Sequence, residues 1–199
     1  MVTFRHDAPG TPEARWAAWS HLRDLPRISA DTPLVVVAAH PDDESLGAGG
    51  LLALTAAAGL EAHVVVATDG EASHPESPTH PAAELARWRA KEVEQAVAGI
   101  APRAHLHLLH LPDGELDRHE DALAEALEPL VQNGSRVAAP WRGDAHPDHE
   151  AAGRVAARVA ADRDAELLEY PVWAWHWGRP GDVRMPWPRA VRLPLGPEV

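Results

Sequence analysis

Residues 34–44 read LVVVAAHPDDE, and the two halves of this stretch decide the fold and the place of its site. The first half is a continuous apolar run without polar alternation, which is typical of a parallel strand buried on both faces. The second half puts one histidine and three acids directly after that strand. We therefore expect a buried strand that ends in a polar loop at the edge of a covered sheet.

Apolar strands and helices alternate from this stretch onward. We expect further strands at 62–67, 105–110, 136–139 and 167–170, and helices through about residue 58 and over 82–98, 119–131 and 150–161. Such alternation predicts an α/β fold, with a doubly wound, mainly parallel sheet in the order 3-2-1-4-5 and helices on both faces. We predict a single domain over 1–199 with its α/β core at 34–170.

The two ends of the chain are expected to pack against this core. Residues 1–33 are predicted to be a helical extension, whose helix is capped by Thr11 and runs to about Leu25. Residues 171–199, rich in proline and tryptophan, are expected to form an irregular C-terminal cover. We expect the tryptophans of both ends to pack, rather than to form an adaptor surface or a platform for sugar rings. They are Trp16, Trp19, Trp173, Trp175 and Trp177.

The composition limits the chemistry that the chain can perform. It has 199 residues with thirteen histidines and no cysteine, which excludes thiol nucleophiles, disulfides and thiolate metal sites. The net charge of −12 argues against a nucleic-acid or membrane partner, because either usually requires a basic face. Charges from Arg5 onward and the short apolar run at 34–39 predict neither a secretory signal nor a membrane span, and hence a cytoplasmic protein. Homo-oligomer formation is left open.

A second cluster of ionisable residues follows the predicted fourth strand, where residues 144–150 read DAHPDHE. In the order 3-2-1-4-5 the first and fourth strands meet where the strand order reverses, and open α/β sheets bind ligands there. Two histidines and a carboxylate suit Zn²⁺, or another divalent metal such as Fe²⁺, with an open position for water. The acids disfavour phosphate binding at the glycines of 47–50, whose spacing does not fit a dinucleotide motif. The spacing does not decide which acids and histidines hold the metal.

The two clusters resemble the signature motifs of the PIG-L/LmbE-type N-acetylglucosaminyl deacetylases. The similarity extends over residues 34–178 and includes TDGE at 68–71, Arg89-x-x-Glu92 and LPDG at 111–114. It implies a Rossmann-like fold and zinc-dependent hydrolysis of the N-acetyl group of a small-molecule amino sugar. The roles it implies are metal ligation by His40, Asp43 and His149, general base for Asp42, oxyanion stabilisation by a protonated His146 that Asp148 orients, and contact with substrate hydroxyls for Arg89.

Other interpretations of the same residues remain open at this point. The chain could be an amide hydrolase that tailors a natural product or a lipid on the same metal site, or a catalytically silent binding module. The loop at 71–81 is either a substrate lid or simply solvated. His105 and His107 alternate with leucines, which favours positions on a sheet face over metal ligation. His110 and Asp113 lie nearer to the predicted site.

Overall fold

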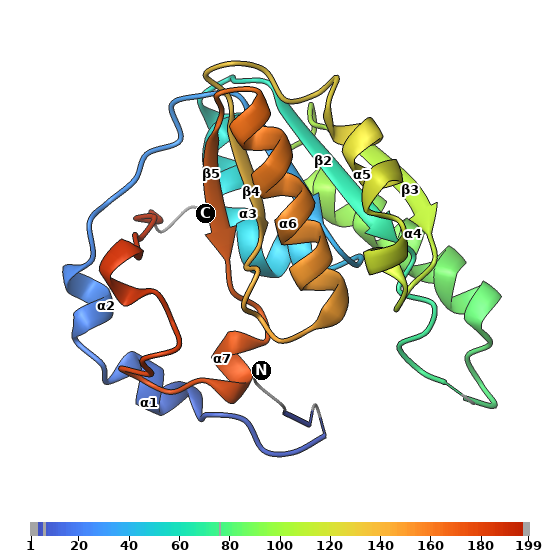
Figure 1. Cartoon of the computed structure of the whole chain (residues 1–199), viewed down its shortest axis with the longest axis horizontal. Coiled ribbons are helices and arrows are strands. Elements are labelled where there is room, and N and C mark those ends of the chain that lie inside the picture. Colours follow the sequence, from blue (N-terminus) through green and yellow to red (C-terminus); the bar gives the residue numbers. More distant parts are fainter. Residues whose placement is uncertain (1–3, 6, 76, 197–199) are drawn as a thin grey trace.

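A five-stranded parallel sheet forms the centre of the molecule (Figure 1). The structure, a computed structural model, describes residues 4–5, 7–75 and 77–196, so positions 1–3 and 6 of the predicted extension and 197–199 of the predicted cover lie outside it. The strand order is β3-β2-β1-β4-β5, as the sequence predicts. The strands are β1 (Leu34–Ala38), β2 (Ala62–Thr68), β3 (His105–Leu111), β4 (Arg136–Pro140) and β5 (Glu166–Tyr170).

Two helices cover each face of the sheet. α5 (Glu120–Leu127) and α6 (Pro147–Asp162) lie in front of it in Figure 1, and α3 (Asp43–Ala57) and α4 (Ala82–Ile100) lie behind it. Alternate side chains of β1 enter the two cores: Val35 and Val37 pack on the α5/α6 side, and Leu34, Val36 and Ala38 on the α3/α4 side. The unbroken apolar run of this strand follows from burial on both faces.

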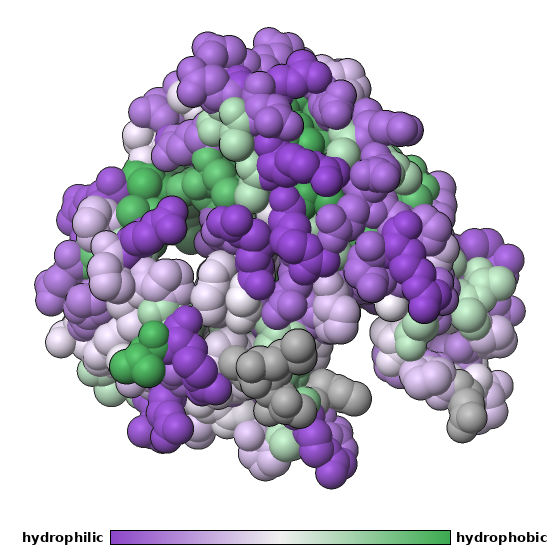
Figure 2. Space-filling view, viewed as in Figure 1, coloured by the Kyte–Doolittle hydropathy of each residue, from purple (hydrophilic) through white to green (hydrophobic). Residues whose placement is uncertain are grey.

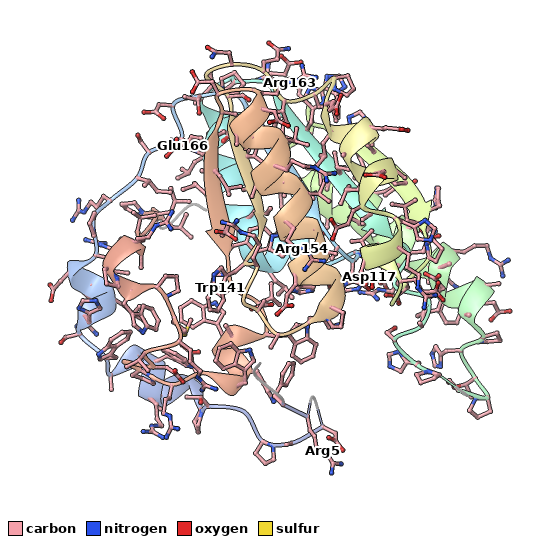
Figure 3. The ribbon with its side chains drawn as sticks, viewed as in Figure 1. Arg5, Asp117, Trp141, Arg154, Arg163 and Glu166 are labelled. Atoms are coloured by element: carbon pink, nitrogen blue, oxygen red, sulfur yellow. The ribbon has the colours of Figure 1, made fainter. Side chains whose placement is uncertain are left out.

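The carboxyl ends of β1 and β4 meet at one edge of the sheet. These strands are parallel neighbours, with Leu34 opposite Arg136 and Val36 opposite Ala138. In Figure 3, Trp141 marks the edge where β4 ends, while Glu166 marks the opposite edge, where β5 begins. Both acidic motifs therefore follow strands that end side by side, at the point where the strand order reverses.

The predicted N-terminal helix is two short helices, α1 (Glu13–Ala17) and α2 (His21–Asp24). Thr11 does not cap α1, since its hydroxyl donates to the carbonyl oxygen of Gly178 instead. Trp16 is buried and donates from Nε1 to the carbonyl oxygen of Trp175 at 3.0 Å. The tryptophans of the two chain ends thus pack mainly on one another, together with α7 (Ala174–Trp177) and η2 (Trp187–Arg189).

Two core helices differ from their predicted bounds. α5 ends at Leu127, short of the predicted residue 131, because Pro129 has no backbone N–H with which to continue the helical hydrogen bonds. α6 begins at Pro147, three residues before the predicted start, because His146 caps the helix and proline suits the first helical position. The second motif therefore lies in the first turn of α6.

The outer face of α5 and α6 is mostly hydrophilic (Figure 2). An ion pair of 2.6 Å between Arg154 and Glu120 joins the two helices there, and Figure 3 shows Arg154 on the outer side of α6. Within the residues that the structure describes, none of the helices combines the length and the hydropathy needed to cross a bilayer.

Candidate active site

The acidic side chains of the turn between β1 and α3 point in different directions. Asp42 has a φ of 121°, a conformation that is costly for a residue with a side chain. The buried Glu44 accepts a hydrogen bond from the backbone N of Asp42 at 3.0 Å and so stabilises this conformation. Oδ2 of Asp43 accepts from the backbone N of Ala39 and of His40, at 3.1 and 2.9 Å. The carboxylate of Asp43 therefore faces the interior, whereas 57% of the Asp42 side chain is exposed.

Three side chains from the two motifs bring potential ligand atoms together. Nδ1 of His40 lies 3.3 Å from Nε2 of His149, and this Nε2 lies 3.4 Å from Oδ1 of Asp43. Oδ2 of Asp43 lies 3.6 Å from Nδ1 of His40. A tetrahedral ion bound at about 2.0–2.1 Å separates its ligand atoms by roughly 3.3 Å. The donor set and its spacing therefore fit a divalent metal of the zinc type.

His40 also has two carboxylates behind it. Its Nε2 lies 3.1 Å from Oδ1 of Asp113 and 3.1 Å from Oδ2 of Asp148. Burial alone would lower the pKa of His40, but the hydrogen bonds that its ring donates to Asp113, Asp148 and Asp43 outweigh burial and raise this pKa well above its usual value. A histidine that presents one nitrogen to a metal commonly gives the other to a carboxylate. Asp113 and Asp148 are placed to support His40 in this way.

Ligand-type atoms also gather in two overlapping sets. Nitrogens of His40, His146 and His149 lie within 4.8 Å of one another, and so do ligand atoms of His40, Asp113 and Asp148. Both sets share His40, and the second uses the side of the ring that faces away from His149. The arrangement therefore offers one centre with a surrounding layer of acids, rather than two independent centres.

Asp144 supports His149 as Asp113 and Asp148 support His40. This role was not predicted from the sequence. The carboxylate of Asp144 is fully buried, and Oδ2 lies 2.8 Å from Nδ1 of His149. The same carboxylate accepts three backbone N–H bonds, from Val172, Trp173 and Ala174, at 3.1, 2.9 and 2.8 Å. With the proton of His149 on Nδ1, its Nε2 is free to bind metal. An acid in the loop after a buried strand, five residues before a candidate ligand, is the signal that could have revealed this residue.

The predicted contact between Asp148 and His146 takes another form. The carboxylate of Asp148 accepts backbone N–H bonds from the loop at 114–116, at 2.8 and 3.1 Å, besides its contact with His40. The backbone N of Asp148, not its carboxylate, donates to Nδ1 of His146 at 3.3 Å. Burial, followed by the charges of His40 and His149, lowers the pKa of His146 to about 4. The imidazole is therefore neutral here at pH 7, although the family resemblance led us to expect a protonated ring.

Arg89 fixes the direction of Asp42. Its Nη2 donates to Oδ2 of Asp42 at 3.0 Å and to the carbonyl oxygen of Pro41, while Nη1 donates to the carbonyl oxygen of Gly70 at 3.1 Å. Partial loss of hydration and the charge of Asp43 raise the pKa of Asp42 to about 6, and Arg89 limits this rise. These three contacts make Arg89 a positioning residue for Asp42. Its contact with substrate hydroxyls stays a prediction.

Of the remaining candidates, some adjoin the centre and others turn away from it. Trp173 lies nearly parallel to His146, with ring centroids 6.3 Å apart. Nδ1 of His110 turns to Oδ1 of Asp69, 2.9 Å away, rather than to the centre. The loop at 71–81 is attached to Asp113 at its start, since Ala72 N donates to Oδ2 of Asp113 at 2.8 Å.

Comparison with known proteins places the chain in a family. Residues 35–160 match the family model described as PIG-L, GlcNAc-PI de-N-acetylase. A 1D-myo-inositol 2-acetamido-2-deoxy-alpha-D-glucopyranoside deacetylase from Nocardioides sp. is 31% identical over 166 residues, covering 79% of this chain and 52% of the relative. The protein with that name from Streptomyces avermitilis is 30% identical over 198 residues, covering 86% of this chain and 64% of the relative.

A solved structure shows the same fold. The conserved protein TT1542 from Thermus thermophilus is 33% identical with a TM-score of 0.57, covering 71% of this chain and 67% of that one. The chain thus spans about half to two thirds of the length of the two curated relatives described above. Together with the two motifs around one donor cluster, these similarities show that the chain belongs to the PIG-L family.

Proposed function

We propose that the protein is a metal-dependent hydrolase that removes the N-acetyl group from an amino sugar or from a small-molecule conjugate of one. The observation that carries this proposal is the geometry of the centre: three inward side chains whose ligand-type atoms approach one another at 3.3 to 3.6 Å, with the exposed carboxylate of Asp42 beside them. The curated relatives, named as deacetylases of a 2-acetamido sugar linked to inositol, support the same substrate class.

The metal that we propose is Zn²⁺, held by His40, Asp43 and His149. Two imidazoles and one carboxylate are a common ligand set for catalytic zinc, although Fe²⁺ can use similar donors. When bound, such an ion acidifies a water molecule and polarises a carbonyl oxygen. The surrounding acids hold the two imidazoles in the tautomers that ligation requires.

Asp42 is proposed as the general base. Its carboxylate is open to solvent, and a pKa of about 6 leaves it mostly ionised at pH 7 yet close enough to neutrality to take a proton. Arg89 and Glu44 hold it in place from two sides. In the proposed reaction, water adds its oxygen to the acetyl carbonyl, Asp42 takes the water proton, the C–N bond breaks, and acetate and the free amine are released.

His146 is proposed to stabilise the developing oxyanion. Because its pKa of about 4 favours the neutral ring, it can act as a hydrogen-bond donor through Nε2 while Nδ1 accepts from the backbone of Asp148. A neutral donor aimed at the oxyanion is an established way to lower such a barrier, typically by a few kcal/mol. The proton that the leaving amine needs is then supplied by protonated Asp42.

The test combines metal analysis with substrates. Asp42→Asn should retain one equivalent of metal and lose at least a hundredfold in turnover, whereas His40→Ala, Asp43→Ala and His149→Ala should each lose metal. Amine release is then measured on a panel of N-acetylated sugars and sugar conjugates, with N-acylated lipids and glycopeptides as the alternative substrates. Turnover of only the alternatives would favour a tailoring amide hydrolase, and bound metal without any turnover would favour a binding module. Metal loss in Asp42→Asn would overturn the division of roles.

Cellular context remains part of the proposal. The sequence predictions of a cytoplasmic location, and of neither nucleic-acid nor membrane partners, fit a small-molecule substrate and a net charge of −12. A homo-oligomer is left open, and light scattering of the purified protein would decide its state.

A further inference from the structure

Three histidines on two neighbouring strands share one face of the sheet, away from the site described above. His63 of β2 stands opposite His105 of β3, and His107 follows two residues later on the same face. The ring of His63 lies 5.0 Å from that of His105 and 5.3 Å from that of His107. Strand pairing therefore collects three imidazoles, which we call the β2–β3 histidine cluster.

Two nitrogens of this cluster have the spacing of metal ligands. Nδ1 of His63 lies 3.1 Å from Nε2 of His107. Two ligand atoms on a tetrahedral ion are separated by roughly 3.3 Å. The catalytic pair of His40 and His149 shows a similar distance of 3.3 Å. The two pairs thus have similar distances between their nitrogens.

A carboxylate supports His63 from behind. Oε1 of Glu61 lies 3.2 Å from Nε2 of His63, the nitrogen that faces away from His107. With its proton on Nε2 and directed to Glu61, His63 presents the Nδ1 lone pair toward His107. This is the carboxylate–histidine arrangement that commonly orients a metal ligand, and it mirrors Asp144 behind His149.

The cluster is accessible and its rings are suited to bind cations. The His63 side chain is 17% exposed and that of Glu61 58%, and His105 is exposed. Burial, followed by the charges of His63 and His105, lowers the pKa of His107, which favours the neutral imidazole. Neutral imidazole is the form that binds metal.

We propose that the β2–β3 histidine cluster is a second, solvent-accessible binding site for a late first-row divalent metal, with Nδ1 of His63 and Nε2 of His107 as ligands. Imidazole donors bind Cu²⁺ most strongly, with Ni²⁺ and Zn²⁺ weaker. His105 stands beside the pair as a third imidazole, and water completes the coordination. Val35, which pairs with His63, precedes His40 by five residues, so about 16 Å along the strand direction separates His63 from His40. A bound ion would tie the edge strand β3 to its neighbour.

In the experiment, Cu²⁺ is titrated into protein that already carries Zn²⁺ at the catalytic centre. The release of Zn²⁺ is measured in parallel, so that Cu²⁺ that displaces Zn²⁺ is counted separately. Wild type should bind one further equivalent, with electron paramagnetic resonance showing hyperfine coupling to imidazole nitrogens. His63→Gln/His107→Gln should bind this equivalent at least tenfold more weakly. His74→Gln/His80→Gln is the matched control, because it removes two histidines whose rings are 6.4 Å apart, and it should change nothing.

A third variant tests the supporting carboxylate. Glu61→Gln should weaken binding of the additional Cu²⁺ by up to about tenfold. This is the lower end of the usual effect of losing such a supporting carboxylate, because Glu61 is more than half exposed. Circular dichroism checks that the double variant is folded, and His107→Gln alone replaces it if it is not. The proposal would be overturned if wild type binds no Cu²⁺ beyond the amount that displaces Zn²⁺. It would also be overturned if the histidine variants bind the additional Cu²⁺ as tightly as wild type.

Discussion

Asp144→Asn is the substitution that most directly tests how the candidate centre is built. Asn has the same shape, so Oδ1 can still accept from Val172 N and Ala174 N, but an amide nitrogen replaces Oδ2. Trp173 N then faces a donor and loses a bond to a charged acceptor, which costs about 1.5–3 kcal/mol of the free energy of unfolding.

The second consequence concerns the tautomer of His149. The new amide donates to Nδ1, so the ring proton moves to Nε2, the atom that lies 3.4 Å from Asp43 and 3.3 Å from His40. A protonated Nε2 cannot ligate, and loss of such a supporting partner typically weakens metal binding by about 10- to 100-fold, or roughly 1.4–2.8 kcal/mol.

The assay is competition for Zn²⁺ with a chromophoric chelator, alongside urea unfolding of the metal-free protein. Asp182→Asn is the matched control, because the buried carboxylate of Asp182 also accepts from a backbone and a side-chain nitrogen, both of Arg184, and these bonds involve no histidine. This control should lose stability and keep its metal affinity. If Asp144→Asn loses stability alone and binds Zn²⁺ as tightly as wild type, Asp144 does not orient His149 for a metal.

Four further predictions concern individual residues of the core and of the candidate site. Gly153→Ala should cost about 1–3 kcal/mol of unfolding free energy in urea melts, since its Cβ would lie 2.5 Å from the carbonyl oxygen that ends β4; Gly99→Ala, with open space around it, should instead gain up to about 1 kcal/mol, and equal effects would refute the packing argument. In the pH dependence of kcat/KM, the acid limb should lie at or below pH 6, because Asp42 must be ionised and a bound dication lowers its pKa further. Arg89→Met should move that limb upward by about 0.7 pH units, since opposite charges about 4 Å apart in water attract by ~1 kcal/mol, and an unmoved limb would contradict the pairing. Tyr170→Phe should lower the free energy of unfolding by about 1–2 kcal/mol, because its buried hydroxyl donates to a β1 carbonyl oxygen at 2.6 Å; an unchanged urea midpoint would contradict this.

The sheet was predictable from sequence because its strands are buried on both faces. A short, unbroken apolar run such as that at 34–38 is typical of a strand enclosed by helices, and once the strands are known, alternation with helices restricts the topology to a few orders. The meeting of the two motifs then follows from chain direction alone. Helix ends were less predictable, since the short-range effects of Pro129 and the cap by His146 compete with hydrophobic periodicity.

The partners of individual side chains could not be predicted. The carboxylate of Asp148 turns to His40 and to the backbone at 114–116, although its sequence neighbour His146 was the expected partner. Asp144 was overlooked as a support because its partners at 172–174 are some thirty residues away along the chain. Such choices depend on where a folded backbone points its N–H groups, and the sequence pattern does not encode that locally.

The contacts of Asp144 also have a consequence for biosynthesis. His149 obtains its oriented tautomer only when residues 172–174 have been synthesised, and α7 packs in turn against Trp16 and Thr11 from the other end of the chain. The segment at 11–16 must therefore wait for the segment at 175–178 before it can dock. A nascent chain that stops after α6 would hold both acidic motifs and still lack the contacts that organise them. Metal capture, under the proposed function, would then require residues 172–174 as well as the two motifs.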